Sequence, residues 1–161
     1  MALLDAYCTA ADVRARTTNS TITSEDSEIG AQALAASRAL DFELGVHAGA
    51  FNAHTAAYAF GGYGTPELFL RDSSGLAYFL RTATEIEVGG ATFDLAASGV
   101  VPLPQNAAAM GAPYTSITLE SGAPVGLWPV GRVATRITGS WGWATVPDAI
   151  REVAVAITRD I

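Results

Sequence analysis

Apolar and polar residues follow two different periods along this chain. Up to about residue 50, apolar residues recur at spacings of three and four, which is the period of one helix face. From about 51 to 140 they alternate with polar residues over short runs separated by glycine and proline, as in strands. The helical period returns near the C-terminus. The pattern therefore predicts helices at both ends of the chain and β-structure between them.

Two helices are predicted before residue 50. The first begins at Thr9, a suitable N-cap, and Asp12 can bond back to the backbone of the cap. The second begins in the acidic cluster at Ser24 and extends to about Val46, so that about 22 residues at 1.5 Å each make it about 33 Å long. Its predicted apolar stripe comprises Ile29, Ala33, Ala36, Leu40 and Leu44.

A third helix is predicted at the C-terminus. Pro147 suits its first position, because proline has no backbone N–H to leave unpaired there. Its apolar face is predicted to contain Ile150, Val153, Ala154, Ile157 and Ile161. That face must be buried, either against its own domain or against a neighbouring molecule.

The middle of the chain predicts several short strands. Residues 84–88 alternate clearly, and Gly89-Gly90 is typical of a hairpin turn into residues 91–93. Further strands are predicted at 66–70, 116–120 and 132–138, while 97–113 is expected to be a long loop, or a loop with an edge strand. We therefore predict an α+β fold. A helical domain of residues 1–50 and 141–161 would carry an inserted antiparallel β region, 51–140, of sandwich or barrel type.

Composition limits the classes of function. The 161 residues are 50% hydrophobic and only 16% charged, and the net charge of -7 leaves no basic stripe for binding nucleic acid. Cys8 is the single cysteine, so no internal disulfide can form. The N-terminus does not have the pattern of a signal peptide, and no stretch predicts a membrane span, so we expect synthesis in the cytosol.

Candidate chemistry is sparse in the sequence. His47, His54 and Cys8 are too few and too scattered to predict a zinc site, and we expect surface or capping roles for the histidines. Cys8 is interpreted as a small buried hydrophobe. Glu85 and Glu87 belong on the polar face of a strand. The run Gly61-Gly62-Tyr63-Gly64 lacks the lysine and hydroxyl pair of a phosphate loop and predicts a turn. No nucleophile elbow is present, so we expect no catalytic residue and no cofactor.

The segment 137–147, Ile-Thr-Gly-Ser-Trp-Gly-Trp-Ala-Thr-Val-Pro, allows two interpretations. Its tryptophans could cover the core at a corner between a strand and a helix, since large aromatic side chains bury much area. Alternatively, Trp128, Trp141 and Trp143 could form the binding platform of a carbohydrate-binding module. A hydrolase that uses His47 or His54 is a third, more distant, possibility.

The same segment carries a family resemblance. A strand ending in Ile-Thr-Gly, then Trp-Gly-Trp, Val-Pro and an amphipathic helix resembles the C-terminus of tailed-phage head–tail connector proteins, also called adaptor or head completion proteins. The opening at 7–13, Tyr-Cys-Thr-Ala-Ala-Asp-Val, is similar to that family's x-T-x-x-D-V/L start of a short helix. The resemblance covers about 5–46 and 135–161, and the inserted β region resembles the longer members from phages of actinobacteria.

The resemblance implies a structural role without catalysis or a metal. It implies an adaptor ring of about twelve copies at the head–tail junction of the virion, assembled after synthesis in the host cytoplasm. The ring would bind the portal protein on one side and the next neck or tail protein, a stopper or tail terminator, on the other. Double-stranded DNA would pass through its channel without specific binding, and no membrane would be involved. The candidate residues for assembly or corner packing are Trp141, Gly142, Trp143, Pro147, Ile150, Val153 and Ile157.

Overall fold

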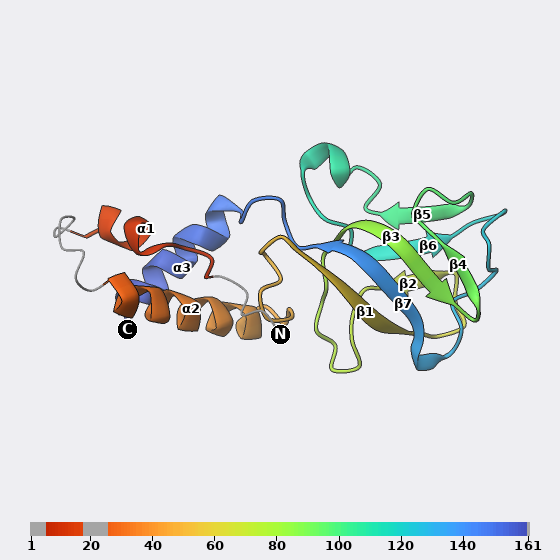
Figure 1. Cartoon of the computed structure of the whole chain (residues 1–161), viewed down its shortest axis with the longest axis horizontal. Helices are drawn as coiled ribbons and strands as arrows, with labels where there is room; N and C mark the ends of the chain where they lie inside the picture. The colour runs from red at the N-terminus through yellow and green to blue at the C-terminus, as the bar shows by residue number, and fades with distance from the viewer. Residues whose placement is uncertain (1–5, 18–25, 161) are drawn as a thin grey trace. The chain divides into compact units, whose positions relative to one another are not determined.

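The chain has a mixed α+β architecture, which confirms the predicted fold class. The computed structural model describes residues 6–17 and 26–160 (Figure 1). By their internal contacts, residues 1–52 and 145–161 form one compact unit and residues 53–144 form another. The first, the helical unit, contains helices α1 (Ala10–Ala15), α2 (Asp26–Glu43) and α3 (Asp148–Asp160). The second, the β unit, contains the strands.

Helix α1 begins where the sequence predicts. Thr9 is its N-cap, and its hydroxyl accepts a hydrogen bond from the Asp12 backbone N–H at 3.1 Å. The Asp12 carboxylate accepts a bond from the Thr9 N–H at 2.7 Å, which completes a capping box. Arg14 forms an ion pair with Asp26 at the start of α2, and α1 contacts both of the other helices.

Helix α2 ends three residues before the predicted boundary at Val46. Gly45 has a positive φ of 63°, and the N–H groups of Gly45 and Val46 bond back to the carbonyls of Phe42 and Asp41. This is a Schellman motif, which ends a helix and satisfies its last carbonyls. Ala33, Ala36 and Leu40 are buried as predicted. Leu44 lies beyond the helix and is exposed, so its assignment to the stripe was wrong. The predicted start at Ser24 lies outside the described residues.

Helix α3 begins at Asp148, one residue later than predicted. Pro147 occupies the N-cap position, and its carbonyl accepts the first helical bond, from Arg151 N–H at 3.0 Å. The helix contacts α1 and α2 and buries Ala154, Val155 and Thr158. Val153 is exposed in the single chain, so the helical unit covers only part of the predicted apolar face. Thr158 can be buried because its hydroxyl donates to the Ala154 carbonyl at 2.7 Å. Ile161 lies outside the described residues.

The β unit consists of two antiparallel sheets. The larger has the strand order β1-β7-β3-β4, and the smaller has the order β2-β6-β5. The strands are β1 (His54–Gly62), β2 (Glu67–Phe69), β3 (Leu80–Val88), β4 (Ala91–Phe93), β5 (Val100–Leu103), β6 (Ser116–Leu119) and β7 (Gly131–Trp141). The hairpin at Gly89-Gly90 joins β3 to β4 as predicted. The segment 97–113 contains the edge strand β5 and a short 3-10 turn.

The core of the β unit lies between its two sheets. Fully buried side chains come from both, among them Phe60, Leu68, Ile86 and Ile117. Leu80 and Tyr114 exchange two backbone hydrogen bonds, of 3.0 and 2.6 Å, which join the start of β3 to the segment before β6. The sheets therefore form a sandwich that is partly closed at one side (Figure 1).

Candidate interaction surfaces

The tryptophans of β7 and of the preceding loop are core residues. Trp141 is fully buried, and its indole N–H donates to the Ala56 carbonyl at 3.0 Å. Its ring makes an edge contact with Tyr58 at 5.0 Å. Trp128 is also fully buried, and its indole N–H donates to the carbonyls of Pro66 at 2.9 Å and Ile117 at 3.2 Å. A carbohydrate platform needs exposed ring faces, and neither of these two rings has one.

The remaining predicted residues divide between the two compact units. Gly142 is buried, adopts a positive φ of 79° and donates its N–H to the Phe79 carbonyl at 2.7 Å, which fixes the corner after β7. Trp143 is half-buried, and its indole N–H has no acceptor among the described residues. Pro147, Ile150, Val153 and Ile157 belong to the helical unit, where Pro147, Ile150 and Ile157 are half-buried.

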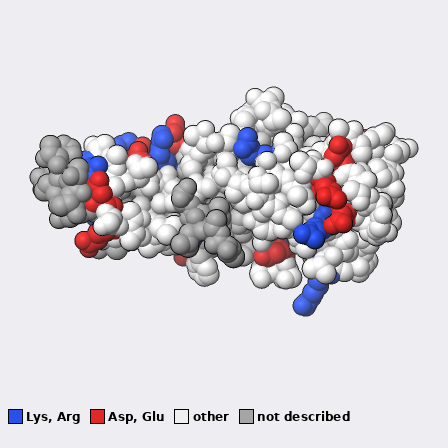
Figure 2. All heavy atoms as spheres, viewed as in Figure 1, with Lys and Arg blue, Asp and Glu red and all other residues white. Residues whose placement is uncertain are grey.

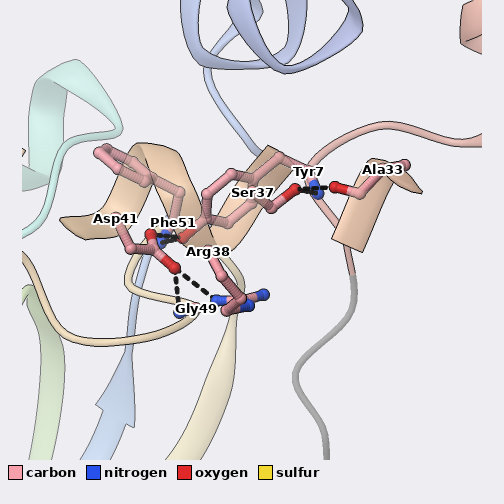
Figure 3. Close-up of polar contacts among 7 residues, drawn as sticks. All are labelled: Tyr7, Ala33, Ser37, Arg38, Asp41, Gly49 and Phe51. Carbon is pink, nitrogen blue, oxygen red and sulfur yellow. Dashed lines mark hydrogen bonds and ion pairs between the residues drawn. The ribbon is translucent and has the colours of Figure 1, made fainter. Parts of the chain in front are cut away.

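A buried polar cluster fastens the N-terminal segment to α2 (Figure 3). The Tyr7 hydroxyl donates to one oxygen of Asp41, and the other oxygen accepts from Arg38 at 2.5 Å and from the Gly49 N–H at 2.8 Å. The Tyr7 N–H donates to the Ser37 hydroxyl at 2.9 Å. Burial raises the pKa of Tyr7, and its bond to Asp41 raises it further. Burial also raises the pKa of Asp41, although the bonds that its carboxylate accepts act in the opposite direction. Both carboxylate oxygens are occupied within the protein, so we interpret the cluster as a structural anchor.

The other titratable candidates form no converged site. His47 is buried just after α2, which contradicts the surface role but not the capping role that was predicted as its alternative. His54 Nε2 lies 3.0 Å from the Tyr58 hydroxyl oxygen. Cys8 is buried as predicted, and burial raises the pKa of its thiol. Glu85 and Glu87 are exposed on β3. Within 6–17 and 26–160, no group of three or more histidine, cysteine or acidic residues is arranged to hold a metal ion.

The helical unit exposes an apolar tip at the C-terminal end of α2. We define the α2 tip as Phe42, Glu43 and Leu44, of which Phe42 is 80% and Leu44 49% exposed. Glu43 lies between them and is also exposed. The Schellman motif fixes the backbone of these residues, so the tip is a preformed feature. Large exposed apolar side chains are typical of interaction surfaces.

The β unit contains a shallow groove of about 750 Å³. We define the β groove by its apolar residues Tyr63, Phe69 and Val130 and by the cations Arg71 and Arg132. Tyr63 is 80% and Val130 78% exposed. The glycines at its floor permit close backbone approach: a Cβ on Gly62 would lie 2.3 Å from the Pro129 carbonyl oxygen. The sequence predicted a turn over Gly61 to Gly64, but Gly61 and Gly62 form the end of β1 and only Tyr63 and Gly64 lie beyond the strand. No sequence pattern indicated that Phe69 and Val130 line the same groove.

The charged side chains at this groove are two arginines and one aspartate. Figure 2 shows that charged side chains are sparse on the visible face of the molecule. Neither Arg71 nor Arg132 forms an ion pair with any residue that the structure describes. Asp72 also lines the groove, but its carboxylate accepts bonds from the Ser74 N–H at 2.8 Å and the Leu76 N–H at 3.1 Å. These hydrogen bonds leave the Asp72 carboxylate charged, so Arg71, Arg132 and Asp72 together give the groove an excess of one positive charge beside apolar surface, in a chain with a net charge of -7.

Comparison with known proteins gives no identification: no family model, no curated protein and no solved structure matches the chain. In the described part of the chain, no helix is both long and apolar enough to cross a membrane.

Proposed function

We propose that the chain is a structural subunit of the phage neck, an adaptor ring that joins the portal to the tail and extends the DNA channel. One observation carries the proposal. The two chain ends, which carry the resemblance to head–tail connectors, fold into one compact unit of three contacting helices, and the β unit is inserted between them. An insertion of this kind lets a helical assembly core acquire a second domain without losing its own packing.

Ring assembly requires two different patches on each copy, because a heterologous interface joins one surface to a different surface of the neighbour. The α2 tip and the β groove are two such surfaces, and they lie on different units. The portal and the next neck or tail protein, a stopper or tail terminator, are the proposed outer partners. A channel lined by a protein of net charge -7 would repel phosphates, so the duplex could slide without being bound.

Helix α3 packs within its own unit, which was one of the two ways expected for burying its apolar face. Its buried residues, Ala154, Val155 and Thr158, are covered within the helical unit by contacts with α1 and α2. Deleting residues 147–161 would therefore remove part of a core, and loss of assembly after such a deletion would not identify an interface. Substitutions of exposed side chains are the better test.

The experiment is reconstitution with the portal of the same phage. The purified chain is mixed with portal rings, and the particles are examined by negative-stain electron microscopy and by mass photometry. We expect an added ring of density, with a mass increment that corresponds to about twelve copies. Portal rings that gain no density at saturating concentrations of the chain would refute the proposal.

A further inference from the structure

We infer that the α2 tip of one copy docks in the β groove of a second copy. The inference rests on the proposed function, because a ring of identical subunits needs a contact between neighbouring copies. Phe42 and Leu44 would cover the apolar part of the groove formed by Tyr63, Phe69 and Val130. Both surfaces are exposed in the single chain and would lose water on contact.

Charge complementarity selects a second copy as the occupant. The tip carries one acid, Glu43, between its two apolar residues in the sequence, and the groove carries two cations, Arg71 and Arg132, against one acid, Asp72. Arg71 uses one nitrogen in a 3.0 Å bond to the Gly75 carbonyl, so its other guanidinium nitrogens can bind a carboxylate. Glu43 forms no ion pair within the described chain. A carboxylate flanked by apolar groups therefore meets cations flanked by apolar groups.

A contact between the tip and the groove joins two different surfaces and can therefore be repeated from copy to copy. The tip belongs to the helical unit and the groove to the β unit, so the two surfaces differ and the contact is head-to-tail. Each copy that docks its tip still offers a free groove to the next copy. A contact of this type produces rings when the rotation closes and filaments when it does not.

Charge reversal tests the contact on the full chain. Association is measured by sedimentation velocity up to millimolar concentrations. We expect Glu43→Arg and Arg132→Glu each to raise the dissociation constant about tenfold or more, and the double variant to recover most of the affinity. Glu43→Arg places a cation in the last turn of α2, which the helix dipole favours, so this variant should fold. Arg81→Glu, an exposed arginine of β3 outside the groove, is the matched control and should associate like the wild type.

Mixing two defective variants tests the direction of the contact. Phe42→Ser/Leu44→Ser keeps the groove and loses the tip, whereas Arg132→Glu keeps the tip and weakens the groove. Each alone should self-associate at least about tenfold more weakly than the wild type, and their mixture should form a one-to-one complex that grows no further at concentrations where neither associates alone. Circular dichroism verifies that each variant is folded. A wild type that remains monomeric throughout, or a double charge variant with no recovery, overturns the inference.

The two proposals fail separately. If all variants join portal-bound rings as well as the wild type, the tip and groove are not the contact, while the adaptor function stands. If the chain associates through tip and groove but adds nothing to portal rings, the contact stands and the adaptor function fails. Binding of the tip to a different protein with unchanged self-association also counts against the inference.

Discussion

Replacing Trp141 by phenylalanine should strongly destabilise the β unit. Trp141 has no exposed surface and packs against Tyr58, Phe60 and Tyr78. The substitution removes the indole N–H that bonds to the Ala56 carbonyl at 3.0 Å. It also leaves space where the five-membered ring was. Both effects act in the folded state, because this tryptophan lies in the cluster between the sheets.

The expected cost follows from these two effects. A buried carbonyl left without its donor costs about 1–3 kcal/mol. A residual cavity of about 40 Å³ adds about 1 kcal/mol at roughly 24 cal/mol per Å³. We therefore expect Trp141→Phe to lower the free energy of unfolding by about 2–4 kcal/mol. With a urea dependence of about 1 kcal/mol per molar for a small domain, the unfolding midpoint should fall by about 2–4 M.

Tryptophan fluorescence during urea unfolding is the assay. All three tryptophans, Trp128, Trp141 and Trp143, lie in the β unit, so the signal reports that unit and not the helical one. Trp143→Phe is the matched control. It is half-buried and its indole N–H has no acceptor among the described residues, so the substitution breaks no hydrogen bond found there and should cost under about 1 kcal/mol. Equal losses in the two variants would refute the interpretation of Trp141 as the buried corner of the core.

Three further predictions concern other parts of the chain. Burial and the neighbouring Asp72 charge raise the pKa of Tyr78 from 10.0 to about 12, so its contribution to stability is complete below pH 10 and is lost as the pH rises toward 12. Between pH 8 and 11, the urea midpoint of Tyr78→Phe should therefore fall less steeply with pH than that of the wild type. The same dependence of the midpoint on pH in both proteins would contradict this. Gly139→Ala would place a Cβ 2.0 Å from a backbone oxygen of β3, so it should disrupt the β unit in the same urea assay, whereas Gly126→Ala meets no atom within 4 Å and should be silent. Thr9→Ala removes the capping box of α1 and should lower the stability of the helical unit by about 1 kcal/mol. Urea unfolding followed by circular dichroism at 222 nm measures this change, and equal unfolding midpoints for variant and wild type would argue against the cap.

The fold was predictable to the extent that it depends on near neighbours. Thr9 and Asp12 interact within one helical turn, and Gly89-Gly90 turns the chain between adjacent strands, so both could be recognised from their spacing. Strand β1 was not predicted individually, although its region was assigned to β-structure. Its weak alternation of small residues gives little hydrophobic contrast, and its pairing with β7 joins segments far apart in sequence.

The candidate surfaces were much less predictable. The α2 tip depends on where the helix ends, and the sequence extended that helix to Val46, which placed Leu44 on the buried stripe. The β groove depends on a loop after β1, a strand residue, Phe69, and a loop before β7, which no local pattern connects. Thr158 can be buried because its hydroxyl bonds to a carbonyl of its own helix, which its polarity in the sequence does not reveal.

The periods, caps and turns could be recognised in the sequence alone, and with them the succession of helices, strands and helix. These features follow from contacts between residues a few positions apart, which the order of side chains fixes directly. Three features required the three-dimensional arrangement of the chain: which apolar residues remain exposed, the burial of Trp141 and Trp128 in the core, and the position of two arginines beside an apolar groove. Whether a side chain is buried depends on contacts with segments that are distant in the sequence. The sequence pattern gives the polarity of each residue, but it does not say which segments cover that residue.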